Sequence, residues 1–72
     1  MQEANKRASI LERLWGRWLQ DLAVAPGEIT LTLRGHSPEA QAETSAVMGR
    51  VLAKEGLPAT LRLVESKTVL TF

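Results

Sequence analysis

Residues 28–58 read EITLTLRGHSPEAQAETSAVMGRVLAKEGLP and carry the clearest folding signals of this 72-residue chain. Residues 28–34 alternate strictly between apolar and polar side chains, which is the period of a half-buried strand. Gly35 then turns the chain, and an apolar stripe at helical spacing runs through residues 37–55. The segment therefore predicts a strand followed by a helix.

The predicted helix at 37–55 has sequence signals at both of its ends. Ser37 is a favourable N-cap residue, and Pro38 fits the first helical position because its missing N–H would be unpaired there. Gly56 stands where a left-handed residue commonly ends a helix, and Pro58 prevents the helix from continuing. These signals favour a helix bounded by Ser37 and Glu55.

Upstream of this segment, the spacing of apolar residues predicts a first helix from Glu3 to Val24. Its apolar side chains recur at intervals of four and three residues, which places them on one helical face. They are Leu11, Trp15, Trp18, Leu22 and Ala25. The turn dipeptide Pro26-Gly27 follows and ends the predicted helix.

Downstream, the chain predicts a hairpin with strands at 59–65 and 68–72 that turns at Ser66-Lys67. A two-residue turn there pairs Leu63 with Leu70 and Leu61 with Phe72, with all four side chains on one face. A four-residue loop with the same register is an equal alternative.

These elements predict an α/β fold, an α+β two-layer sandwich in the order α-β-α-β-β. We expect a three-stranded mixed sheet with two helices on one face, because each strand has one apolar face. The strands at 28–34 and 59–65 run parallel, and the last strand lies either outside the second or between the first two. Residues 1–72 form a single small domain, and their start in helix-like sequence suggests a larger parent protein.

Composition excludes several classes of function. The chain has no Cys and a single His, so disulfides, Cys-based metal sites and a His-rich zinc site are excluded. No apolar run is long enough to span a membrane, and the first nine residues lack the apolar stretch of a signal peptide. We expect a non-enzymatic protein without cofactor, metal or small-molecule substrate. We expect it in a bacterial cytoplasm, with a periplasmic assembly domain as the alternative.

The predicted first helix has more apolar surface than a three-stranded sheet needs, because two Trp residues lie on its stripe. One interpretation is that both Trp residues only cap a small core. The alternative, which we favour, is self-association into a homodimer or larger assembly, or docking on a partner protein. The predicted interface consists of Leu11, Trp15, Trp18, Leu22 and, on an exposed sheet edge, Phe72.

A second functional hypothesis comes from basic residues and a resemblance. The residues concerned are Thr30, Leu31, Arg34-Gly35, Gln41, Val47-Met48 and Arg50-Val51. At this ungapped spacing, residues 28–51 resemble the C-terminal domain of translation initiation factor 3, whose β-α-β-α-β-β sandwich also matches the predicted order without its first strand. The resemblance implies ribosomal RNA binding through Arg34, His36 and Arg50. The second hypothesis is therefore an RNA- or ribosome-binding domain whose anion or RNA contacts are Arg34, His36, Arg50 and Lys54.

Overall fold

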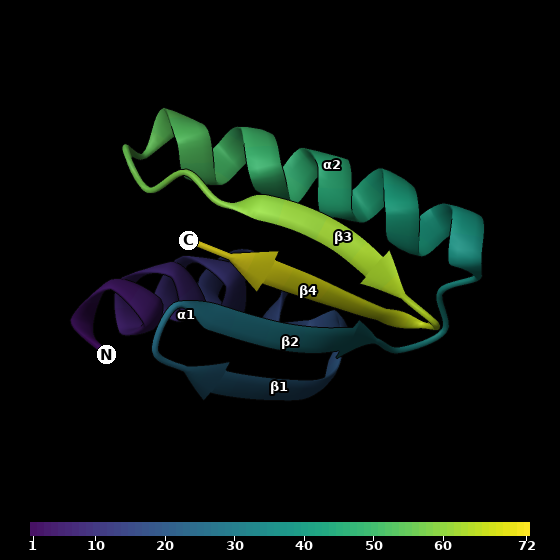
Figure 1. Ribbon diagram of the computed structural model, residues 1–72. Coiled ribbons are helices and arrows are strands. Elements are labelled where there is room, and N and C mark those ends of the chain that lie inside the picture. Colours follow the sequence, from purple (N-terminus) through teal and green to yellow (C-terminus); the bar gives the residue numbers. More distant parts are fainter.

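A computed structural model describes residues 1–72. In chain order it contains α1 (Gln2–Trp15), the 3₁₀ turn η1 (Gly16–Trp18), β1 (Leu19–Ala25), β2 (Glu28–Leu33), α2 (Pro38–Lys54), β3 (Thr60–Val64) and β4 (Lys67–Thr71). The strands form one antiparallel sheet in the order β1-β2-β4-β3, with both helices against the same face (Figure 1). The predicted α/β class is confirmed, but the sheet has four strands instead of three and is antiparallel throughout instead of mixed.

The fourth strand comes from the segment predicted as the second half of the first helix. The helix does not extend to Val24; it ends at Trp15, and the chain passes through η1 into β1. Leu22 lies opposite Leu31 and Val24 opposite Ile29, so residues 19–25 obey a strand period as well as a helical one. Pairing with β2 decides between the two periods, because it satisfies the backbone groups along both strands.

The hairpin of β3 and β4 exists, but its predicted register is wrong. Leu61 lies opposite Leu70 and Leu63 opposite Thr68, a shift of two residues from the predicted pairing. The turn lies one residue earlier than predicted, at Glu65-Ser66, and Glu65 has a φ of 59°. The shift keeps the apolar face toward the helices, because moving a strand by two residues preserves its faces.

β4 lies between β2 and β3 and is antiparallel to both, so the alternative with the last strand in the middle is correct. The two edges of the sheet are therefore β1 and β3. The strand that precedes Phe72 is central, contrary to the prediction, and its end is tied to the β1–β2 turn by a bond from Phe72 N to Gly27 O of 3.1 Å.

α2 matches its prediction closely. Ser37 Oγ accepts a hydrogen bond from the amide of Ala40 at 3.2 Å, which caps the helix. At the other end Gly56 has a φ of 75°, and Leu57 N donates to Leu52 O at 2.9 Å. This arrangement is the expected glycine-containing helix end.

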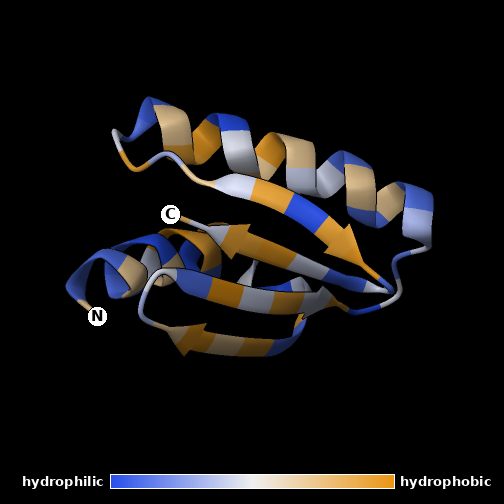
Figure 2. Cartoon of the chain, viewed as in Figure 1, coloured by the Kyte–Doolittle hydropathy of each residue, from blue (hydrophilic) through white to orange (hydrophobic).

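The core lies between the helices and one face of the sheet. Figure 2 shows the alternation of apolar and polar residues along β2 that follows from this one-sided burial. The buried cluster consists of Ala8, Ile10, Leu11, Ile29, Leu31, Leu33, Met48, Leu52 and Leu70. Fifteen of the 72 residues are buried, so the core is small and leaves apolar side chains near the surface.

Candidate functional site

The residues predicted as a first-helix interface do not share one surface. Leu11 is fully buried and belongs to the core, so it is not available to a partner. Trp15 is half-buried and packs against the core. Leu22 lies on the inner face of β1 and also packs against the core. These positions are separated because the helix ends at Trp15, so the predicted apolar stripe does not form.

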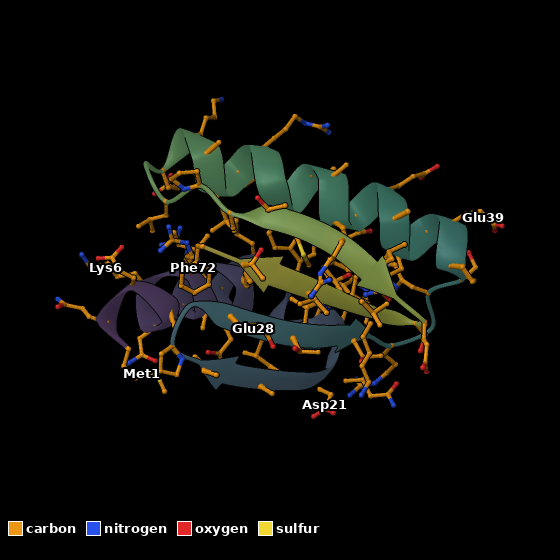
Figure 3. The ribbon with its side chains drawn as sticks, viewed as in Figure 1. Met1, Lys6, Asp21, Glu28, Glu39 and Phe72 are labelled. Carbon is orange, nitrogen blue, oxygen red and sulfur yellow. The ribbon has the colours of Figure 1, made fainter.

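The other two predicted interface residues are exposed but lie at opposite ends of β2. Trp18 is 44% exposed, and its carbonyl accepts from the amide of Arg34 just after β2. Phe72 is 37% exposed and is bonded to Gly27 just before β2, where its ring lies beside α1 (Figure 3). A six-residue strand separates these ends by about 20 Å. One small contact surface does not include both side chains.

The predicted anion-binding residues are also separated. His36 Nδ1 lies 3.1 Å from the carbonyl oxygen of Arg34, which places both residues in the connection between β2 and α2. Arg50 and Lys54 lie in the last turns of α2. Arg50 is 12 residues beyond Pro38, a rise of about 18 Å along the helix. RNA binding stays a prediction. Its four residues form two pairs at opposite ends of α2.

The sequence did not reveal that the two sheet edges differ. β1 has a register irregularity between Leu19 and Asp21, and Pro26 follows its end. Bulges and prolines are devices that protect an edge from pairing with another chain. β3 pairs regularly with β4 along all five residues and has no bulge, and Pro58 lies two residues before it, outside the paired stretch. β3 is therefore the edge that is open to a further strand.

The register shows which backbone groups of β3 are free. Because only two residues separate Val64 from its partner Lys67, this pair exchanges both hydrogen bonds, and the pattern alternates along an antiparallel ladder. Arg62 and Thr60 therefore bond to β4. The N–H and C=O groups of Leu61 and Leu63 point away from β4 to the free edge.

A groove between α2 and β3 lies beside these free groups. Its lining residues are Ala42, Ser45, Ala46, Gly49, Leu61, Arg62 and Leu63. Small side chains form the helical wall, and a Cβ at Gly49 would lie 3.4 Å from Leu61 Cδ1. Leu63 is 39% exposed within it. Because three consecutive residues of β3 line the groove, the strand's backbone edge borders it as well as one of its faces.

The groove suits an extended chain better than a small molecule. Its volume of about 290 Å³ lies at the lower limit of small-molecule pockets. The only ionisable residue in its lining is Arg62, and the chain has no cluster of three metal-ligating side chains. Apolar contacts and backbone hydrogen bonds are therefore the chemistry that the site offers.

Two further hollows lie along α1. One is lined mainly by polar residues, namely Gln2, Asn5, Lys6 and Ser9, together with Ile10 and Leu57. The other surrounds Arg7 and Phe72, and the guanidinium there is already bonded to Pro58 O and Glu3. The first hollow contains no strand residue, and the second reaches β3 only at Thr60, whose backbone groups bond to β4.

Comparisons with models of protein families, with curated proteins and with solved structures find no match to this chain. Neither α1 nor α2 combines the length and the apolar character that crossing a membrane requires. The groove and the free edge of β3 are thus the surface features that best fit a binding function.

Proposed function

We propose that this domain is a non-enzymatic protein-interaction module that binds through the free edge of β3 and the groove beside α2. The observation that carries the proposal is the pair of unpaired peptide groups at Leu61 and Leu63, next to an apolar groove. An added strand would bond to these groups and place alternate side chains in the groove, which is a recurring mode of peptide and protein recognition.

The proposed contact surface is smaller than the interface predicted from the sequence. Leu11 is buried and Trp15 packs against the core, so these two residues offer little free surface to a partner. The sheet edge remains as the contact, and it is β3 rather than the strand before Phe72. Leu63, with 39% of its surface exposed, is the central apolar side chain of this contact.

Photo-crosslinking in the source cell tests the proposal. A benzophenone amino acid at position 63 of the full-length protein should yield discrete crosslinked protein products. The same residue at Arg13, which is exposed on α1, is the matched control and should yield none. Absence of discrete products from position 63, or the same products from both positions, would overturn the proposal.

A further inference from the structure

Resting on the proposed function, we infer that the occupant of the β3 edge is a second copy of this chain. The two β3 strands pair antiparallel around a two-fold axis, and the two α2 helices lie antiparallel beside each other over the joined sheet. The contact is isologous, because each copy presents the same edge and the same groove to the other.

The distribution of charge on α2 favours a second copy. Glu39 and Glu43 lie on its N-terminal half, and Arg50 and Lys54 lie on its C-terminal half. Their spacings of four, seven and four residues place all four on one side of the helix, opposite the buried residues Gln41, Ser45, Met48 and Leu52. All four side chains are exposed, and Glu39 projects into solvent at the start of α2 (Figure 3).

None of these four charges has a partner within the chain. The only ion pairs join Glu3 to Lys6 and to Arg7. Within α2, Glu39 stands four residues from Glu43 and Arg50 four residues from Lys54, which are like-charge neighbours. In an antiparallel pair of copies, the acidic half of each helix lies beside the basic half of the other, so opposite charges become neighbours along the outer rim of the helix pair.

The strand edge selects one register for the pairing. Only residues with free backbone groups can exchange hydrogen bonds, so Leu61 and Leu63 must face odd-numbered residues of the second copy. Centring the pairing on Leu63 places each Arg62 beside Val64 of the other copy on the open face. Centring it on Arg62 would place two guanidinium groups opposite each other, which is unfavourable. The geometry therefore points to Leu63 facing Leu63.

The groove allows this approach. The helical wall consists of Ala42, Ser45, Ala46 and Gly49, whose small size leaves room beside it for a second helix and strand. Leu63 of each copy then fills the space between the helices, where its exposed surface becomes buried.

A single cysteine tests the register, because the chain has none of its own. In Leu63→Cys, the two thiols belong to a directly opposed pair with a Cα separation of about 5.5 Å, which is within the range of a disulfide. In Thr60→Cys, on the same strand, the two positions lie about 20 Å apart in the joined sheet. Oxidation of the full chain should therefore crosslink Leu63→Cys into a dimer and leave Thr60→Cys monomeric.

Charge-reversal variants test the contact between the two α2 helices, and sedimentation velocity measures their dimerisation. One variant has Glu39→Lys and Glu43→Lys, and the other has Arg50→Glu and Lys54→Glu. Each alone should dimerise at least about tenfold more weakly than the wild type, and an equimolar mixture should recover the wild-type affinity. The same charges also interact with the helix dipole, but that interaction is not recovered by mixing.

Three results would overturn the inference: equal crosslinking of both cysteine variants, no recovery on mixing, or a wild-type chain that stays monomeric up to about 1 mM. If the chain is monomeric while position 63 still crosslinks to a different protein, the proposed function stands and the second copy is the wrong occupant. If position 63 also yields no product, both proposals fail.

Discussion

The guanidinium of Arg7 lies 4.2 Å from the centre of the Phe72 ring, which joins the first helix to the last residue of the chain. Arg7 Nη2 and Nε also donate to the carbonyl of Pro58 at 2.8 and 3.3 Å. Its Nη1 donates to the carbonyl of Glu3 at 3.0 Å. A single side chain, 8% exposed, thus holds α1, the α2–β3 connection and the end of β4 together.

Replacing Arg7 with Met should lower the free energy of unfolding by about 2–3 kcal/mol, because charge-assisted hydrogen bonds and the contact with the ring are lost together. Urea denaturation followed by circular dichroism measures the change. Lys6→Met on the same helix is the control, since Lys6 is exposed and pairs only with Glu3 at 3.7 Å. A similar loss in both variants would contradict the role given to Arg7.

A buried polar cluster around Thr68 should also contribute to stability, and removing its central hydroxyl should destabilise the fold. Thr68 is fully buried, accepts from Gln41 Nε2 at 2.8 Å and lies 2.6 Å from Ser45 Oγ. Thr68→Val keeps the shape but leaves the two groups on α2 without a partner. We expect a loss of about 2 kcal/mol in urea denaturation.

Removing the whole cluster should restore most of that stability. In the triple variant Gln41→Leu, Ser45→Ala, Thr68→Val, no buried polar group is left unpaired, so the desolvation penalty disappears. We expect its free energy of unfolding within about 1 kcal/mol of the wild type. A triple variant less stable than Thr68→Val alone would show that the hydrogen bonds themselves stabilise the fold.

Local signals predicted those elements that carry their own end markers. α2 was predicted within one residue at each end, because Ser37 and Gly56 mark its limits by hydrogen bonding and by a positive φ. β2 was also located, since its alternation is not compatible with a helix. In these segments the local preference and the tertiary environment agree.

Residues 19–25 show why the rest could not be predicted. Leu22 fits both a helical stripe with Trp18 and a strand alternation with Val24, and only the position of β2 beside it decides. The order of the strands is equally non-local, since β4 enters the middle of the sheet after α2. Leu63 lies on a free edge only because of that order, so the candidate site could not be predicted from local sequence patterns.

The division between core and surface on α1 gives a matched pair of substitutions. Leu11 is fully buried, whereas Leu14 on the same helix is 44% exposed. Leu11→Ala should lower the free energy of unfolding by about 3 kcal/mol through a cavity in the core, and Leu14→Ala by less than about 1 kcal/mol. Thermal denaturation of both variants measures the difference, and equal losses would be inconsistent with this placement of α1.

The β3–β4 turn contains a residue whose backbone is unfavourable for its side chain. Glu65 has a φ of 59°, a conformation that glycine adopts without steric penalty. Glu65→Gly should raise the stability by about 0.5–1 kcal/mol, because the strain removed exceeds the added entropy of the unfolded chain. For a domain of this size the midpoint of thermal unfolding should rise by about 2–8 °C.

Ser66→Gly is the control: Ser66 has no positive φ, so glycine there adds only entropy to the unfolded chain and should lower the midpoint. A fall in the midpoint of Glu65→Gly would show that the Glu65 side chain stabilises the turn by more than its backbone strain.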